Sequence, residues 1–579
     1  MRFYLSLAAV FLFSTVSVTP QAGDRGVEAK NGVVVCTSAT ACDAGASVLA
    51  RGGNAVDAAV ATAFALAVTH PSAGNLGGGG FMIVRTRDGH ATAFDYRERA
   101  PMRSTREMYL GSDGHIAREL TNTGYLAPGV PGTVRGLELA HRRFGKLPWK
   151  DVVMPAVRLA EDGFLLPAGL ARDLNTQVAG EMKPFAASVA AYGKPGGGPW
   201  VEGDRLVLPD LGKTLRAIAE NGPDVFYTGW IADRIADDMK AHGGLITRQD
   251  LAAYQARVRT VVKGTYRGYE IISMPPPSSG GVALVEMLNI LEPYDLKSKG
   301  LLTASALHLE IEAMRRAYLD RARSLGDPDF VKVPVAELIS KRHARVAAAT
   351  IDLAKASNSV ELGRDIVTAP PAHEPDETTH FSVLDRSGMA VSSTYTLEGG
   401  FGSHVVVSGA GFILNNEMGD FNRKPGETNV QGDIGTPANL IAPGKRMLSS
   451  MTPTMVTKNG KLVLITGSPG GRTIINTVFT VVLGVVEYGL TGRQAVDLVR
   501  LHHQWLPDTA SIERDGAPPE TVLAALTAMG HTLRLGIRQG DAESIWIASD
   551  GTAYGVNDTR SANSKASTPS NLTAPTTER

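Results

Sequence analysis

The chain has 579 residues, of which 43% are hydrophobic and 20% are charged, as in an ordinary large globular protein. Its 58 basic and 58 acidic residues give a formal net charge of zero, which argues against a nucleic-acid-binding protein, because such proteins are usually basic. Four arginines of one expected helix are interpreted as a solvated face rather than a binding patch: Arg315, Arg316, Arg321 and Arg323.

The N-terminus has the pattern of a secretory signal. Met1 and Arg2 give a positive start, residues 3–18 are apolar, and the pattern breaks at residues 19–22. A membrane anchor is the alternative, but the apolar run is shorter than the roughly 20 residues that a spanning helix needs. We expect residues 1–22 to be cleaved off after Ala22 and the protein to be secreted or periplasmic.

The chain has only two cysteines, Cys36 and Cys42. In an exported protein they could form a disulfide across a short loop, and two buried free thiols fit the sequence equally well. No further Cys or His pair has the spacing of metal ligands, so we expect no metal site and no cofactor.

The first expected elements are a buried strand at 32–36 and an alanine-rich helix over 55–68, whose residues at helical spacing form one packed side. Four glycines, at 77–80, then lead into a strand. A phosphate-binding loop is excluded here, because these glycines precede a strand and no Gly-Lys-Ser/Thr follows.

Further along the chain we expect a strand at 92–96 and a largely helical region over 130–330 that includes a helix from about 304 to 325. Beyond a proline-bearing stretch at 369–377 the pattern changes to strands. The expected strands are 380–397, 405–414, 451–457, 462–467, 543–548 and 552–556, and the expected helices are 473–488, 493–500 and 518–529. Residues from about 561 to 579 are predicted to be disordered. Strands flanked by helices on both sides of the stretch at 369–377 indicate one layered α/β body.

Thr378 stands where the polar stretch meets a strand, and its hydroxyl is a candidate nucleophile. Attack on the carbonyl of Glu377 would shift the peptide to an ester, and hydrolysis of that ester would leave Thr378 with a free α-amine. Such an amine has a pKa of about 7.7–8, so it can accept the hydroxyl proton without a histidine or aspartate. The pattern alone also fits an ordinary structural threonine in a strand.

Several motifs together resemble the γ-glutamyltranspeptidase (glutathione hydrolase) family, in the family's order and from about residue 31 to about residue 560. They are 52–59, 77–80, 95–98, 129–132, 378–385, 394–397, 414–421, 448–454 and 466–471. The resemblance implies an N-terminal-nucleophile hydrolase with an αββα sandwich. It also implies self-cleavage into a large subunit, 23–377, and a small subunit, 378–579, which stay together as a heterodimer.

The resemblance assigns catalytic roles to four residues. Thr378 matches the nucleophile, and Thr396 matches the threonine that hydrogen-bonds its hydroxyl. Gly470 and Gly471 match the oxyanion hole, in which backbone N–H groups face the developing negative charge.

The resemblance also implies a site for the two charged groups of an amino acid. Arg97 matches the clamp for the α-carboxylate, since a guanidinium grips a carboxylate through two parallel hydrogen bonds. Its hydroxyl partners are Ser449 and Ser450. The residues that match the holders of the α-ammonium are Glu398, Glu417 and Asp420.

Three positions depart from the usual pattern of the family. Position 398 is Glu where many members have Asn, and position 417 is Glu where Gln is also common. Residues 424–446 resemble a lid loop, but Gln431 stands near the place of an aromatic gate. We therefore expect an open pocket in which hydrolysis competes strongly with transfer.

The implied activity is hydrolysis and transfer of γ-glutamyl groups from glutathione and related compounds, with water, amino acids or dipeptides as acceptors. An acylase for glutaryl-type or cephalosporin side chains is an alternative within the same fold. The three acids argue against it, because a glutaryl group has no α-ammonium. A processed but inactive binding protein is a further alternative, against which the complete set of catalytic residues argues.

Overall fold

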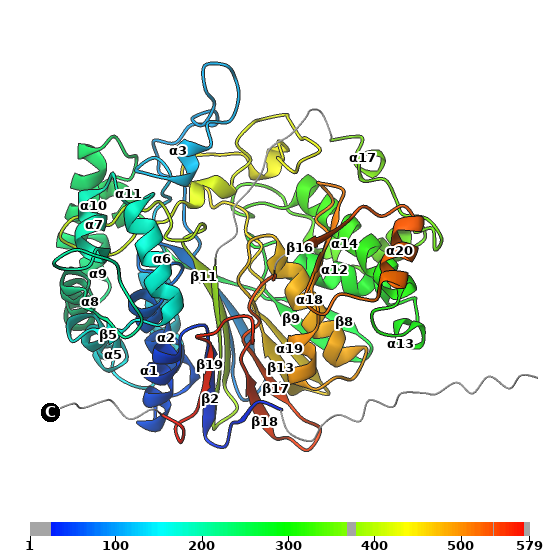
Figure 1. Cartoon of the computed structure of the whole chain (residues 1–579), viewed down its shortest axis with the longest axis horizontal. Helices are drawn as coiled ribbons and strands as arrows, with labels where there is room; N and C mark the ends of the chain where they lie inside the picture. Colours follow the sequence, from blue (N-terminus) through cyan, green and yellow to red (C-terminus); the bar gives the residue numbers. More distant parts are fainter. Residues whose placement is uncertain (1–24, 367–377, 537, 573–579) are drawn as a thin grey trace, which may run out of the picture.

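The computed structural model describes residues 25–366, 378–536 and 538–572. Two large sheets lie face to face in the middle, and helices cover the outer face of each (Figure 1). This is the αββα sandwich that the sequence predicts. The expected signal segment, 1–22, and Glu377 lie outside the described residues.

The first sheet has the strand order β19-β2-β10-β11-β3-β4-β7, and all neighbouring strands are antiparallel. Its strands are β2 (Gly32–Cys36), β3 (Gly79–Arg85), β4 (Ala91–Asp95), β7 (Arg257–Arg259), β10 (Thr379–Asp385), β11 (Ala390–Thr396) and β19 (Lys565–Ser567).

The second sheet has the order β1-β18-β17-β13-β12-β9-β8 and is also antiparallel throughout. Its strands are β1 (Val27–Glu28), β8 (Val262–Tyr266), β9 (Tyr269–Ser273), β12 (Thr454–Lys458), β13 (Lys461–Thr466), β17 (Ser544–Ile547) and β18 (Ala553–Val556).

Helices of the first half of the chain, drawn on the left in Figure 1, cover the first sheet. They are α1 (Ala39–Ala50), α2 (Ala55–Thr69), α4 (Thr133–Phe144), α5 (Trp149–Glu161), α6 (Ala168–Ala179), α7 (Ala186–Tyr192), α8 (Pro209–Asn221), α9 (Asp224–Tyr227), α10 (Trp230–Ala241) and α11 (Arg248–Ala252), with the short β5 (Phe164–Leu165) and β6 (Arg205–Leu206) among them. Every residue of α2 is buried, and an Asn54–Asp57 capping box fixes where this helix starts.

The helices on the right in Figure 1 pack against the second sheet. They are α12 (Gly280–Leu291), α13 (Leu296–Lys299), α14 (Ala304–Ser324), α15 (Val335–Leu338), α16 (Lys341–Ala348), α17 (Ser359–Leu362), α18 (Thr473–Val486), α19 (Gly492–Asp497) and α20 (Glu520–Ala528). A small sheet of β14 (Leu501–His502), β15 (Ala510–Glu513) and β16 (Leu533–Gly536) lies on the same side.

Side chains alternate across β10, as a strand between two cores requires. Phe381 and Val383 join the core under α2, whereas Leu384 joins the core between the two sheets. Because all seven residues of β10 are buried, the register of this strand is strongly specified.

Strands from before and after the stretch at 367–377 alternate in both sheets. In the first sheet β10 and β11 lie between β2 and β3, and in the second β12, β13, β17 and β18 lie between β1 and β9. Neither part of the chain therefore forms a complete sheet alone.

Three sequence-based predictions are wrong. Residues 405–414 form no strand and pair only at two isolated bridges, Val406 with Ile413 and Leu414 with Gly77. His404, Gly409 and Gly411 have positive φ angles that interrupt an extended run. The expected disordered tail contains β19, which pairs with β2. The expected solvated face of α14 is also wrong, since Arg315, Arg316 and Arg321 are buried.

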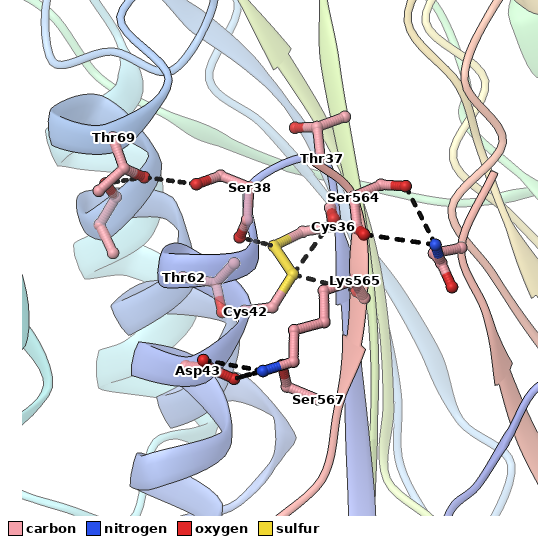
Figure 2. The surroundings of a disulfide bond; sticks show 12 residues. Cys36, Thr37, Ser38, Cys42, Asp43, Thr62, Thr69, Ser564, Lys565 and Ser567 are labelled. Atoms are coloured by element: carbon pink, nitrogen blue, oxygen red, sulfur yellow. Dashed lines mark hydrogen bonds and ion pairs between the residues drawn. A yellow bond between two sulfur atoms is a disulfide. The ribbon is translucent and has the colours of Figure 1, made fainter. Parts of the chain in front are cut away.

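Cys36 and Cys42 form a disulfide, the first of the two possibilities left open by the sequence. Figure 2 shows that it joins the end of β2 to the first turn of α1. Beside it, Lys565 of β19 forms an ion pair with Asp43 at 2.7 Å. In the described part of the chain, no helix combines the length and the hydrophobicity needed to cross a membrane.

Candidate active site

Thr378 lies immediately before β10, with only 6% of its surface exposed. The pairing of Thr379 with Tyr395 brings Thr378 next to Thr396, the last residue of β11. Its hydroxyl donates to the Thr396 hydroxyl across 3.4 Å, and the backbone N–H of Glu398 donates to that same Thr396 oxygen at 2.8 Å. The structure thus brings the expected nucleophile and its expected partner together.

Gly470 and Gly471 connect β13 to the start of α18. Their φ angles are +121° and +53°, in a region that favours glycine, and the N–H and hydroxyl of Thr473 both donate to the Gly470 carbonyl. Backbone amides that precede a helix N-terminus are suited to stabilise a negative charge, because the helix dipole adds to their own hydrogen bonds.

Arg97 follows β4 and is completely buried. Its two terminal nitrogens donate to Glu417 and Asp420, at either end of the 3-10 helix η1 (Glu417–Asp420). The guanidinium also donates to the backbone carbonyls of Met447 at 3.3 Å and Leu448 at 3.2 Å. Arg97 is therefore held rigidly, with its charge balanced by acids of the pocket.

Glu98 lies beside Arg97 and is also completely buried; neither of its carboxylate oxygens has a hydrogen-bond partner among the described residues. Burial raises the pKa of Glu98 to about 7, against the opposing effect of Arg97. Burial also raises the pKa of Glu417, although Arg97 lowers it. Burial alone would lower the pKa of Arg97, but Glu417, Asp420 and Glu98 raise it instead. The three acids around Arg97 outnumber its single positive charge, so the buried carboxyl groups of this cluster keep their protons to higher pH than free acids do.

Ser449 and Ser450 lie beside the two residues whose carbonyls contact Arg97. The Ser449 hydroxyl accepts a bond from the N–H of Met451 at 3.1 Å, and the Ser450 hydroxyl accepts one from Arg321 of α14 at 3.1 Å. Arg321 was not predicted to reach this site, because a regular helix pattern does not reveal which charged residue points inward.

These side chains line one pocket. Its walls are formed by Arg97, Thr378, Thr396, Glu398, Glu417, Asp420, Ser449, Ser450, Met451, Gly471, Arg472 and Ile474. Of the expected site residues that the structure describes, only Gly470 is not part of the wall, and it adjoins Gly471. Met451, Arg472 and Ile474 were missed, although all three lie within three residues of an expected site residue.

The loop at 424–446 is tied to the rim of this pocket. Arg472 donates to the Gly432 carbonyl at 3.1 Å, and Arg118 forms an ion pair with Asp433 at 2.8 Å. Gln431 is not among the lining residues, so the residue near the expected gate does not cover the nucleophile.

Two groups of side chains in the described part of the chain have a spacing that a metal ion could use, and neither shares a residue with the pocket. They are His308, Glu312 and His531, and Glu286, Asp320 and His343. In the first group Glu312 pairs with Arg315 and Arg316, and in the second His343 pairs with both acids. Ion pairs thus already use Glu312 of the first group and all three residues of the second, and the two histidines of the first group hydrogen-bond to each other at 2.8 Å.

The sequence profile of the family described as "Gamma-glutamyltranspeptidase" matches residues 41–568. A curated relative, "Glutathione hydrolase proenzyme" of Escherichia coli (strain K12), is 49% identical over 535 residues, which cover 92% of this chain and 91% of the relative. "Acylase ACY 1 proenzyme" of Pseudomonas sp. (strain SE83) is 38% identical and covers 94% of this chain and 93% of its own.

Solved structures agree on the fold. The cephalosporin acylase from Bacillus halodurans has a TM-score of 0.81 at 27% identity and covers 96% of this chain and 99% of its own. One chain of the γ-glutamyltranspeptidase from Helicobacter pylori has a TM-score of 0.54 at 43% identity and covers 55% of this chain and 91% of its own.

Proposed function

The chain belongs to the gamma-glutamyltranspeptidase family, and we propose that it cleaves itself before Thr378 and then hydrolyses and transfers γ-glutamyl groups of glutathione and related amides. One observation carries this proposal. The Thr378 hydroxyl, the oxyanion glycine Gly471 and a buried Arg97 with its acids share a single pocket. Such a pocket suits a substrate that has a scissile amide at one end and an amino-acid zwitterion at the other.

Self-cleavage completes the site. The Thr378 oxygen attacks the carbonyl carbon of Glu377, the C–N bond breaks as an ester forms, and the hydroxyl proton passes to the departing nitrogen. Water then hydrolyses the ester, which leaves the Glu377 carboxylate, the Thr378 hydroxyl and a new α-amine.

In catalysis this amine accepts the proton of the Thr378 hydroxyl while the oxygen attacks the γ-carbonyl of the substrate. The N–H groups of Gly470 and Gly471 stabilise the oxyanion, and the departing amine takes up the proton. A γ-glutamyl ester of Thr378 remains. Water releases glutamate from this ester, whereas an amino acid or dipeptide releases a new γ-glutamyl compound.

Substrate recognition exchanges partners within the Arg97 cluster. The α-carboxylate takes the place of Glu417 and Asp420 on Arg97, with the hydroxyls of Ser449 and Ser450 as its further partners. The α-ammonium then neutralises these two acids together with Glu398. A glutaryl group would separate the acids from Arg97 and offer them no cation.

This exchange predicts a strong preference for γ-glutamyl over glutaryl amides. Since breaking a buried ion pair costs about 3–5 kcal/mol, we expect kcat/KM for a glutaryl anilide to be lower by a factor of about 10² to 10⁴. Equal values for the two anilides would favour the acylase alternative.

Replacement of the nucleophile tests the activity itself. Thr378→Ala should remain one chain on a denaturing gel and should not hydrolyse a γ-glutamyl anilide, because both steps use the same oxygen. Thr379→Ser, one residue further on, is the matched control and should be processed. A Thr378→Ala protein that is still processed would contradict the mechanism.

We further propose that residues 23–377 and 378–579 persist as the two subunits of a heterodimer, and that the protein is exported after removal of residues 1–22. The interleaved strands support the first point, and the Cys36–Cys42 disulfide supports an oxidising compartment. N-terminal sequencing of both mature subunits tests these boundaries.

A further inference from the structure

Two buried carboxyl groups lie directly behind the oxyanion segment. Glu543 is completely buried and Asp541 is 8% exposed. Neither oxygen of Glu543, and not Oδ1 of Asp541, has a hydrogen-bond partner among the described residues. Burial has the largest effect on both pKa values, but the two side chains also interact directly, because Asp541 raises the pKa of Glu543 and Glu543 lowers that of Asp541. They therefore lie close together.

Among the residues that the structure describes, no cation forms an ion pair with Asp541 or Glu543. The neighbouring arginines, Arg500 and Arg560, are occupied by two other acids: both bind Asp558 at 3.1 Å, and Arg560 also binds Glu513 at 2.6 Å. Two ionised carboxylates side by side in such a place would repel each other and would lack solvation. A proton on one lets it donate a hydrogen bond to the other.

The backbone of the same segment supports the oxyanion glycines. The N–H of Asp541 donates to the Ser468 hydroxyl at 2.9 Å, and the Cα of Gly540 lies 3.4 Å from the place that a Cβ would take on Gly470. Glu543 is fixed to the nucleophile strand, because its carbonyl accepts a bond from Ser382 of β10 at 2.8 Å. The carboxyl pair is thus built into the contact between β10 and the segment from Ser468 to Gly471.

We propose that Asp541 and Glu543 are positioning residues that hold protons in the active enzyme, and that their ionisation displaces the segment supporting Gly470 and Gly471. This inference rests on the proposed function only for its catalytic consequence. Burial raises the pKa of both groups, and the charge of Asp558 raises it further.

The other charged and titratable groups around the pair do not replace this proton. They are Asp558 and Arg560 after β18, Arg500 after α19, Glu513 at the end of β15 and His380 on β10. The four charged groups pair with one another, and burial lowers the pKa of His380 to about 3, so this ring is neutral. From α18, Thr477 faces Gly540 and does not titrate.

The test uses the mature enzyme and a double variant, Asp541→Asn with Glu543→Gln, in which amides imitate the protonated acids. Asp515→Asn, an exposed acid whose side chain is 76% accessible, is the control for a general change of charge. Hydrolysis of a γ-glutamyl anilide without acceptor is followed from about pH 6 to about pH 10, the range in which raised carboxyl pKa values fall.

We expect kcat of the wild type and the Asp515→Asn control to fall about tenfold per pH unit once the pair ionises, with little change in KM, whereas kcat of the double variant should persist to higher pH. Identical alkaline profiles of wild type and double variant would overturn the proposal.

A second measurement needs no activity and decides the matter if the double variant is poorly processed. Infrared difference spectra of the wild type between about pH 7 and about pH 10 should show a carboxylic-acid carbonyl band that disappears at the higher pH. Either single variant, Asp541→Asn or Glu543→Gln, should weaken this band.

A wild type without such a band would overturn the proposal. A melting temperature that Ca²⁺ or Mg²⁺ raises in the wild type alone would also overturn it, because the pair would then be a cation site. A wild type that shows the band but does not cleave γ-glutamyl compounds would refute only the proposed function.

Discussion

At the scale of single residues, the excess of acid around Arg97 is the dominant feature of the pocket. The guanidinium contacts Glu417 and Asp420, and Glu98 lies 3.6 Å away in the same buried space. One arginine cannot balance the two buried carboxylates, Glu98 and Glu417, together with the partly exposed Asp420, so protons complete the balance. The net charge of the pocket before substrate binds therefore depends on pH near neutrality.

A Glu98→Gln variant should reveal the proton on Glu98 through the pH dependence of the melting temperature. The pKa of Glu98 is raised from 4.5 to about 7 in the folded protein, so between these values the unfolded chain loses a proton that the folded chain keeps. Stability due to Glu98 therefore falls as pH rises through this window and is constant above it. The melting temperature of the wild type relative to the variant should decline from about pH 4.5 to about pH 7.

Titrations of other groups occur in both proteins and cancel in this difference. A constant difference across the window, or one that grows with pH, would show that Glu98 is ionised throughout.

The sequence predicted most residues of the site but not their arrangement. Thr378, Thr396 and Gly471 occur in recognisable motifs and line the pocket as expected. The contact of Arg321 with Ser450 depends on how α14 packs against a distant segment, and no local pattern predicts such packing. The buried carboxyl pair was missed for the same reason, since burial of an acid is a property of the fold.

At the scale of elements, local pattern predicted α2, α14 and the strands β12, β13, β17 and β18 well, because their apolar residues follow a clear period. It was wrong at 405–414, where positive φ angles interrupt the run. It failed at β19, a three-residue strand in a polar tail. This strand forms because it can pair with β2 at the edge of the first sheet, and its Lys565 forms an ion pair with Asp43. Tertiary pairing thus overrides the low strand propensity of the tail.

The disulfide between β2 and α1 should stabilise the first sheet at the strand next to β10. Closing a loop with a sequence separation of 6 residues limits the unfolded chain and contributes about 2 kcal/mol in the chain-entropy model. We expect the double variant Cys36→Ser with Cys42→Ser to melt at a lower temperature than the wild type. Reductant should lower the melting temperature of the wild type and leave that of the variant unchanged; a wild type insensitive to reductant would contradict the assignment.

At the scale of the whole molecule, each half of the chain supplies strands to both sheets. Seven strands from before the stretch at 367–377 are interleaved with the later ones. In the first sheet β2 lies on one side of β10 and β11, and β3, β4 and β7 lie on the other; in the second sheet β1 lies on one side of the later strands, and β9 and β8 lie on the other. All four hydrophobic clusters include residues from both halves. The proposed cut before Thr378 would therefore break the chain covalently, while the shared sheets and cores would hold the two products together.

Because strands of the two halves are interleaved, the kinetic order of refolding depends on whether the chain has been cut. An uncut chain brings its two halves together in a unimolecular step, whereas two cut chains must first meet, so their refolding is second order in protein concentration. The yield of refolded wild-type mature protein should rise with concentration at dilutions where aggregation is absent, and that of Thr378→Ala should not. If both yields are independent of concentration, the halves fold separately. If the yields differ as expected, self-cleavage makes assembly effectively irreversible. The uncut chain folds in a unimolecular step, and the cut that activates the enzyme removes the covalent link on which that step depends.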